Sequence, residues 1–336
     1  GRSGEPLALN LPWPRWLRNV YPATVLFVGL TWLELGWGVT MSPRATAALG
    51  LLMVVLAVLP ALIFERRSFC KYVCLIGRIC GLYSMIAPVE VRARDRRICG
   101  SCDTRDCLEG NENGYACPTG QFLGTMTSNT YCTVCTECAK TCPHDNVALN
   151  LRPWGSDLNA LRKPRRDEAI LALVMLSMTS FHGLTMTPAW TDITGWIQGV
   201  AHVSYLPAFS IGMLAILLVP GALFLQTSVA AAGLGAVKRR DGFWRMASGY
   251  AYPLIAVALM YHLAHNAGHF LVEAGAVVPV LSDPMGTGMN LLGTADLRLG
   301  AIASMEVIWG IQVVLVLLGH LWAVRATGRA HANLAS

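Results

Sequence analysis

Long apolar stretches, separated by shorter polar and charged segments, dominate the hydrophobic pattern of this chain. An α-helix that crosses the hydrocarbon core of a bilayer needs about 20 mostly apolar residues. Six stretches meet that requirement, with approximate bounds Val20–Met41, Ala45–Phe64, Glu168–Met186, Leu206–Ala230, Met246–Val272 and Val307–Val324. The pattern therefore predicts an all-α polytopic membrane protein with about six transmembrane helices.

The composition agrees with a membrane location. Of the 336 residues, 54% are hydrophobic and only 14% are charged, and the mean hydropathy is +0.47. A soluble domain usually carries about 25% charged residues, so these values exclude a single water-soluble globule. They also exclude intrinsic disorder, which requires low hydrophobicity.

Basic residues are distributed asymmetrically about the six stretches. All of the 26 lysines and arginines except Arg44 and Arg298 fall on one side of a six-helix arrangement. Because such residues stay in the cytoplasm, both chain ends and residues 65–168 are predicted to face it, in a bacterial inner membrane. The net charge of +6 then follows from topology and does not indicate a nucleic-acid partner. The first residues are unlike a signal peptide, and a start at Gly1 is compatible with missing upstream sequence.

The chain has 11 cysteines, all within residues 70–142. An odd number cannot be paired completely in disulfides, and disulfide scaffolds are typical of small secreted chains. Clustered cysteines in a membrane protein indicate metal ligation first. Eight of them form two runs that end in Cys-Pro: Cys99, Cys102, Cys107 and Cys117, then Cys132, Cys135, Cys138 and Cys142.

The second run has the spacing C-x2-C-x2-C-x3-C-P, which is that of bacterial ferredoxins with 4Fe–4S clusters. In two-cluster ferredoxins the fourth cysteine of each run binds the other cluster. That rule predicts one cluster on Cys99, Cys102, Cys107 and Cys142, and a second on Cys132, Cys135, Cys138 and Cys117. The alternative is a pair of structural zinc sites, which also use C-x2-C. Zinc does not require the third cysteine at this spacing or the proline.

These runs, with Asn111–Gly114 and Asn129–Tyr131 between them, resemble the membrane-bound polyferredoxins of the NapH, NosR and CcoG type. The resemblance covers roughly residues 20–155. It implies transmembrane helices joined to a cytoplasmic two-cluster ferredoxin-like domain. We therefore divide the chain into an N-terminal arm with two helices (1–68), a juxtamembrane segment (69–94), the ferredoxin domain (95–155) and a four-helix membrane half (156–336).

The juxtamembrane segment contains Cys70 and Cys74, where the resembling family has C-x3-C-P; Leu75 replaces the proline here. On a helix the two thiols would lie one turn apart on the same face. They are compatible with a redox dithiol, a soft-metal site such as Cu(I) or a position beside a flavin. Buried packing as small hydrophobes is the alternative. Cys80 is a weaker candidate.

Four histidines in the membrane half are a second candidate site: His182, His262, His265 and His269. The last three share one helix face, and ionisable residues inside a bilayer tend to be functional. They are compatible with a b-type haem, a copper or iron centre, or a quinone site. The alternative is that they only form hydrogen bonds between helices.

Together these features predict a redox subunit of a larger respiratory complex rather than a stand-alone enzyme. Electrons would pass between the two clusters, a quinone, haem or metal site in the membrane half, and a partner redox protein. A second reading is a copper-handling reductase or an assembly factor for a metalloenzyme, with Cys70 and Cys74 as substrate ligands. A third reading is a transporter in which the clusters are structural. The resembling family serves several such pathways, so the fold does not choose among them.

Overall fold

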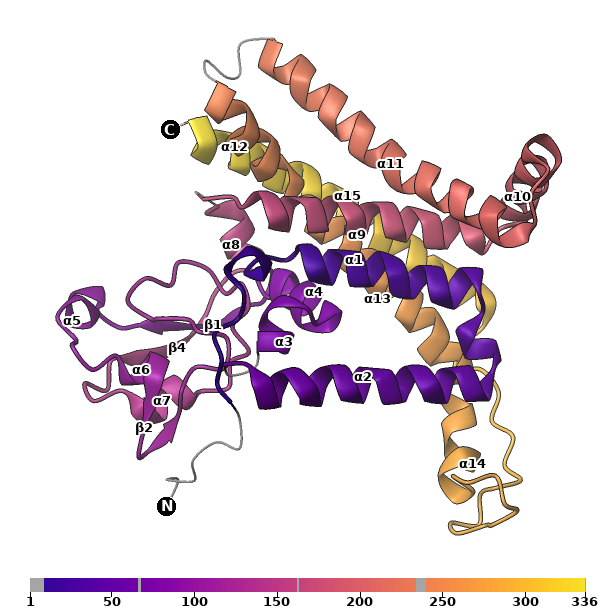
Figure 1. Ribbon diagram of the computed structural model, residues 1–336, viewed down its shortest axis with the longest axis horizontal. Helices are drawn as coiled ribbons and strands as arrows, with labels where there is room; N and C mark the ends of the chain where they lie inside the picture. Colours follow the sequence, from indigo (N-terminus) through magenta and orange to yellow (C-terminus); the bar gives the residue numbers. More distant parts are fainter. Residues whose placement is uncertain (1–8, 66–67, 162, 234–239, 336) are drawn as a thin grey trace.

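The computed structural model describes residues 9–65, 68–161, 163–233 and 240–335, and they are mostly helical. The long helices are α1 (Tyr21–Thr31), α2 (Pro43–Ile63), α9 (Arg166–Thr185), α11 (Tyr205–Ala231), α13 (Leu254–Glu273) and α15 (Met305–Ala335). The shorter α10 (Pro188–Ala201), α12 (Arg240–Ala251) and α14 (Val277–Ser282) connect them. Figure 1 shows the cysteine-bearing segment at one end of the long helices, with α10 and α14 near the other end.

Four helices in the described part of the chain are long and apolar enough to cross a membrane. They are Pro43–Ile63, Arg166–Thr185, Tyr205–Ala231 and Met305–Ala332. Each coincides with a stretch that the sequence pattern predicts, and most of their ends differ from the predicted ends by one or two residues. These four predictions are confirmed as apolar helices of membrane-spanning length.

The other two predicted spans are helical but do not reach that standard. Helix α1 passes into a π-helical turn at Trp32–Gly36 and stops before Gly38, whose φ of 66° is left-handed. Helix α13 has 20 residues, but three histidines and Asn266 lower its hydropathy. Length and composition alone therefore support four spans rather than six.

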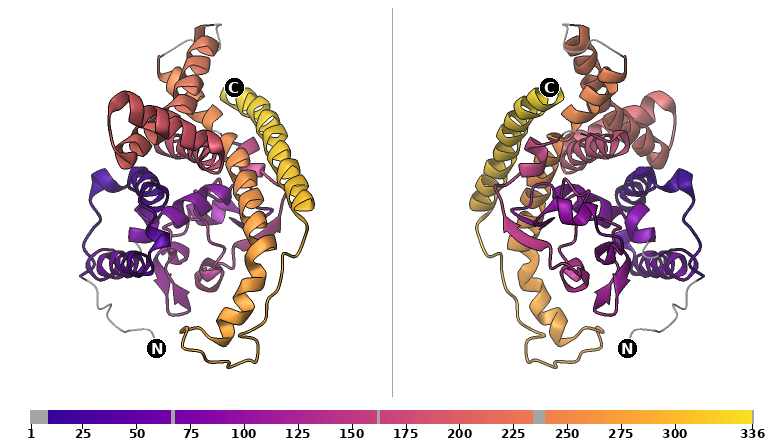
Figure 2. Two further views of the ribbon diagram at one scale, coloured as in Figure 1. Left: turned by 90° about the vertical axis from the view of Figure 1, so that its right-hand side faces the viewer. Right: turned by 90° about the vertical axis from the view of Figure 1, so that its left-hand side faces the viewer.

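Both of these helices nevertheless lie against long apolar helices. The side-chain amide of Gln312 in α15 donates to the carbonyl of Ala264 in α13 (3.2 Å). One turn earlier in α13, a Cβ added at Gly319 would lie 2.9 Å from Cβ of Met260. Because residue numbers rise along α13 as they fall along α15, the two helices are antiparallel. Figure 2 shows this pair on one side of the molecule and α1 with α2 on the other.

The cysteine-bearing segment lies between α2 and α9 and folds around short elements. It contains α3 (Ser68–Tyr72), α4 (Leu75–Tyr83), α5 (Arg96–Gly100), α6 (Asp106–Glu109), α7 (Glu137–Thr141) and α8 (Ser156–Asn159). Two antiparallel sheets of two strands each complete it: β1 (Val89–Ala93) with β4 (Val147–Leu151), and β2 (Gly110–Asn111) with β3 (Gly114–Tyr115). Since β1 pairs with β4, the two ends of the part that carries both cysteine runs lie side by side.

Two buried carboxylates fix this segment, Asp157 from within it and Glu168 from the membrane half. Asp157 accepts hydrogen bonds from Arg152 and from the backbone N–H of Asn129 (2.6 Å). Glu168, at the start of α9, accepts the hydroxyl groups of Tyr131 (2.9 Å) and Tyr252 (2.5 Å). Buried charges are stable only when they are paired and hydrogen-bonded, and both conditions hold here. Tyr131 directly precedes a cysteine of the second run, so the cysteine loop is fixed against α9.

Candidate functional site

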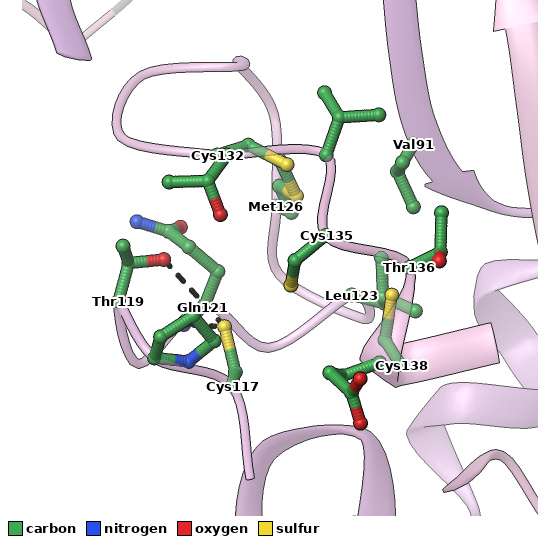
Figure 3. A pocket seen from close by; sticks show the side chains of 14 residues that line it. Val91, Cys117, Thr119, Gln121, Leu123, Met126, Cys132, Cys135, Thr136 and Cys138 are labelled. Carbon is green, nitrogen blue, oxygen red and sulfur yellow. Dashed lines mark hydrogen bonds between the residues drawn. The ribbon is translucent and has the colours of Figure 1, made fainter. Parts of the chain in front are cut away.

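The eight cysteines of the two runs surround two neighbouring cavities. One is lined by Cys117, Cys132, Cys135 and Cys138, and the other by Cys99, Cys102, Cys107 and Cys142. Figure 3 shows the sulfur atoms of the first group facing the same space. Each cavity collects three cysteines of one run and the last cysteine of the other run. This is the combination that the sequence spacing predicts.

Short helices place the third cysteine of each run in the same way. Cys107 is the second residue of α6, and Cys138 is the second residue of α7. Each helix begins after a residue in left-handed conformation, Arg105 (φ 49°) or Thr136 (φ 60°). The two runs therefore share a local backbone design, although the spacing within them differs.

The fourth cysteines are equivalent as well. Cys117 Sγ accepts the backbone N–H of Gln121 (3.3 Å), and Cys142 Sγ accepts that of Asn146 (3.4 Å). In both turns the intervening residue before the donor is left-handed, with φ of 67° at Gly120 and 46° at Asp145. A Cys-Pro turn with an N–H directed at the sulfur thus occurs twice, once at the end of each cysteine run. The two runs therefore end in the same local structure.

The loop of the second run is strained. Tyr131, Val134 and Thr136 all have left-handed φ, at 68°, 51° and 60°. This conformation is a genuine outlier for β-branched residues such as valine and threonine. Strain of this kind costs on the order of 1–3 kcal/mol per residue and concentrates at functional sites. The surrounding contacts hold the loop in a shape that directs three cysteines toward one cavity.

Asn146 contacts cysteines of both runs and was not found from the sequence. Its backbone N–H donates to Cys142, and its side-chain amide donates to Cys99 Sγ (3.3 Å) and to the carbonyl of Asp95 (2.7 Å). The residue is buried, and its side-chain oxygen accepts the backbone N–H of Asp95. Its spacing of four residues after the Cys-Pro cysteine is the signal that would have identified it.

Burial affects the ionisation of four of these thiols. Burial, followed by the charges of neighbouring sulfurs, raises the pKa of Cys138 to about 12. Burial also raises the pKa of Cys99, Cys107 and Cys132. Several thiolates in one cavity repel each other, so a cationic metal centre is the group that would make them stable together.

The cysteine side chains around the two cavities do not converge on a single point. Among the described residues, no three His, Cys, Asp or Glu side chains converge closely enough to hold a single metal ion. Four sulfurs on one zinc ion would lie about 3.8 Å apart, because each Zn–S bond is about 2.3 Å. In a 4Fe–4S cluster each thiolate binds a different iron, so the four sulfurs spread around a larger group. Four cysteines around each cavity are the donor set that such a cluster requires.

The structure brings the four candidate histidines together, but their rings touch one another. The ring centroids of His182 and His265 are 4.6 Å apart, as are those of His265 and His269. His269 also contacts Glu273, and His262 forms a hydrogen bond with the hydroxyl of Tyr83. Direct ring contact leaves no room for a haem between His182 and His265. One of the four, His262, has an interhelical hydrogen bond, as the alternative interpretation expects, and the haem or metal site stays a prediction.

The prediction that Cys70 and Cys74 share one helix face is wrong. Helix α3 ends at Tyr72, and Cys74 adopts an extended conformation as the N-cap of α4, where its sulfur accepts the N–H of Gly77 (3.5 Å). The helix breaks because a residue that caps α4 cannot continue α3. Cys70 and Cys80 instead line a common cavity that Cys74 does not line.

No protein-family model, curated protein or solved structure matches this chain. The resemblance to polyferredoxins consequently stands on the cysteine spacing. The grouping of the cysteines around two cavities is the structural observation that bears on it.

Proposed function

We propose that this protein is a membrane-bound electron carrier with two 4Fe–4S clusters, of the polyferredoxin kind. The observation that carries the proposal is the division of eight cysteines between two neighbouring cavities. Leu123 lines both cavities, so at that point a single side chain separates the two centres. Such proximity favours electron exchange between them.

Each cluster, when bound, supplies a one-electron redox couple. The protein tunes it through hydrogen bonds to sulfur, burial and net charge. Asn146 and Gln121 direct N–H groups at Cys99, Cys142 and Cys117. These donors favour the reduced form, which carries more negative charge.

We further propose that α1 and α13 also cross the membrane, giving six spans with the cysteine-bearing segment in the cytoplasm. The backbone N–H of Val20 donates to Asp167 at the start of α9 (3.1 Å), and Trp32 donates to Ser210 near the start of α11 (2.8 Å). Helix α9 is long and apolar enough to cross a bilayer, and α1 extends beside it from one end toward the other. The π-helical turn at Trp32–Gly36 continues α1 in the same direction with a wider helix.

A quinone is the proposed partner within the bilayer. A cavity of about 370 Å³ lies among α1, α9, α11 and α12, with mostly apolar walls. Arg166 stacks on Trp244 at this cavity, with 5.3 Å between guanidinium carbon and ring centroid. Ala251 lines it, and the next residue, Tyr252, bonds Glu168, which in turn bonds Tyr131 beside Cys132. This chain of contacts links the cavity to the second cysteine group.

The copper-handling alternative has less support from the charges. Lys71 and Arg78 line the same cavity as Cys70 and Cys80. Two positive side chains disfavour a Cu(I) ion at these thiols. A copper role would therefore require a site other than this cavity.

The decisive experiment measures iron, acid-labile sulfide and electron paramagnetic resonance spectra of the detergent-purified protein. We expect about eight iron per chain from two cubanes and two overlapping signals after reduction. Cys99→Ser should remove one signal and Cys135→Ser the other, since each removes a ligand of a different cavity. Cys74→Ser, which lies outside both cavities, should leave both signals.

Bound zinc without iron would overturn the proposal. So would retention of both signals in the Cys99→Ser and Cys135→Ser proteins. Loss of both signals in Cys74→Ser would show that the changes act through folding rather than ligation.

A further inference from the structure

A third cavity lies between the juxtamembrane helices and the cysteine loops. It has a volume of about 210 Å³, and its lining includes Cys70, Lys71, Arg78, Cys80, Tyr131 and Cys132. Cys132 also lines the cavity of the second cysteine group. The third cavity therefore stands directly beside that group while having its own walls.

The charged side chains that line this cavity are both positive. Lys71 and Arg78 line it, whereas no aspartate or glutamate does. Lys71 Nζ lies 5.3 Å and the Arg78 guanidinium carbon 5.7 Å from the centroid of the Tyr72 ring, so both cations belong to one neighbourhood. Lys71 also lines a neighbouring cavity with Glu65 and Glu109, and Arg78 does not line that one. The cavity beside the second cysteine group therefore favours an anionic ligand, with Arg78 as its principal cation.

Of the two cations, Arg78 gives the stronger evidence for an anionic ligand. The residue is only 6% exposed, and its Nε has no hydrogen-bond partner in the described structure. Its guanidinium stacks on the ring of Tyr131, with 4.1 Å between guanidinium carbon and ring centroid. A buried charged donor without a partner is costly. Nε itself is covered, so a ligand with several acceptor oxygens would bind the terminal nitrogens of the guanidinium and neutralise its charge.

Gly120 leaves the space that Lys71 occupies. A Cβ added at Gly120 would lie 2.7 Å from Lys71 Nζ, and its φ of 67° is left-handed. The turn after Cys117 thus brings a residue without a side chain to the ammonium group. Gly120 lines the neighbouring cavity that also contains Lys71, so this turn places the lysine where the two cavities meet.

We propose that this cavity binds a phosphate group through Lys71 and Arg78. A phosphate monoester carries a charge of about −1.5 to −2 at neutral pH, which matches two cations. Arginine binds phosphate through its planar fork, and lysine binds it as a point charge. The cavity is larger than one phosphate requires, so an organic remainder also fits. The group can come from a soluble phosphate compound or from a lipid headgroup at the membrane surface.

The two thiols in the cavity provide a readout that does not depend on iron–sulfur clusters. An occupant would shield Cys70 and Cys80 from alkylation, whereas Cys74 would serve as an internal reference. We would expose the full-length protein to N-ethylmaleimide and quantify the three labelled sites by mass spectrometry. One arm uses phosphatidylcholine nanodiscs with inorganic phosphate against chloride at equal ionic strength. The other uses nanodiscs containing phosphatidylglycerol without added phosphate.

We expect an occupied cavity to slow alkylation of Cys70 and Cys80 at least fivefold and to leave Cys74 unchanged. Lys71→Gln should raise the half-protecting phosphate concentration about tenfold or more, as expected for loss of one charged hydrogen bond. Lys140→Gln, an exposed lysine on α7 outside the cavity, should behave as the unaltered protein. Arg78→Lys keeps the charge but loses the fork, and it should weaken protection to an intermediate degree.

Protection in the phosphate arm assigns a soluble ligand, and protection in the phosphatidylglycerol arm assigns a lipid. Absence of protection in both arms overturns the proposal, as does equal protection in the Lys71→Gln protein. Because no step of this test measures iron, its failure would not bear on the proposed electron carrier. Failure of the carrier proposal would likewise leave this result intact.

Discussion

At the scale of single residues, the side chain of Asn146 connects a cysteine sulfur to the backbone that surrounds it. The residue bonds two sulfurs of the same proposed cluster and also both backbone groups of Asp95. Gln121 holds the equivalent position in the other turn, but its side chain bonds the carbonyl of Thr130 rather than a sulfur. The two positions therefore form a natural pair for comparison.

Asn146→Leu should lower the reduction potential of one cluster. The substitution keeps the backbone donor to Cys142 and removes the side-chain donor to Cys99. Loss of about 1 kcal/mol of preference for the reduced form corresponds to roughly 40 mV for a one-electron couple. Redox titration followed by electron paramagnetic resonance measures the shift.

Gln121→Ala is the matched control, because its backbone donor to Cys117 remains. It should leave both potentials within experimental error. Equal shifts in the two variants, or none in either, would contradict the assigned role of the Asn146 side chain.

The grouping of the cysteines around the two cavities is predictable from sequence because three members of each group are closely spaced along one loop. The partners of those cysteines are less predictable, since they depend on folded contacts. Asn146 lies 47 residues from Cys99, and nothing local indicates that contact. The histidines show the converse: their shared helix face is predictable, but the direct ring contacts between His182 and His265 depend on how α9 and α13 pack.

At the scale of elements, the short helix α4 fixes the position of the cysteine loop through Gly81. A Cβ at this position would lie 2.0 Å from Cδ1 of Tyr131, and the Gly81 carbonyl accepts the Tyr131 N–H (3.2 Å). Only a residue without a side chain allows this close approach. The glycine therefore keeps Tyr131 between α4 and Glu168.

Gly81→Ala should destabilise the protein despite the higher helix propensity of alanine. Forcing a methyl group against a packed ring costs about 1–3 kcal/mol. Thermal unfolding in detergent, followed by tryptophan fluorescence, should show a lower midpoint. Limited proteolysis should cleave the cysteine-bearing segment faster.

Gly50→Ala provides the comparison, because nothing lies within 4 Å of a Cβ at that position of α2. The same gain in helix propensity should leave its midpoint unchanged or higher. A midpoint for Gly81→Ala equal to that of Gly50→Ala would show that the contact with Tyr131 does not position the loop.

The ends of the long apolar helices were predictable because their hydrophobic runs are uninterrupted. Breaks within shorter segments were not. The stop between α3 and α4 depends on Cys74 acting as a cap, and the π-helical turn at Trp32–Gly36 has no signal in the hydrophobic pattern. The amino-acid composition of this segment is as consistent with one continuous helix through Cys70 and Cys74 as with the observed break. Contacts in the folded protein decide between them.

At the scale of the whole molecule, packing decides how many helices cross the bilayer. Helix α13 falls short in composition because of its histidines, yet it lies antiparallel to α15 along most of its length. If α15 crosses the bilayer, a helix packed along it would be expected at the same depth. The polar side chains of α13 would then need partners on neighbouring helices, and His262 has one in Tyr83.

The side of the membrane on which the chain ends distinguishes the two counts. With six spans, the end of α15 returns to the side of the cysteine-bearing segment, as Figure 1 places it. If α1 and α13 did not cross, α15 would end on the opposite side. The basic residues Arg325 and Arg329 follow the apolar part of α15 and favour the cytoplasm.

Fusion of reporters to the C-terminus tests this directly. We expect a green fluorescent protein fusion to fluoresce and an alkaline phosphatase fusion to be inactive, because the phosphatase folds only outside the cytoplasm. Reporters inserted after Gly286, in the loop between α14 and α15, should give the opposite result. An active phosphatase at the C-terminus would contradict six spans, and it would leave α13 as a helix that enters the bilayer without crossing it.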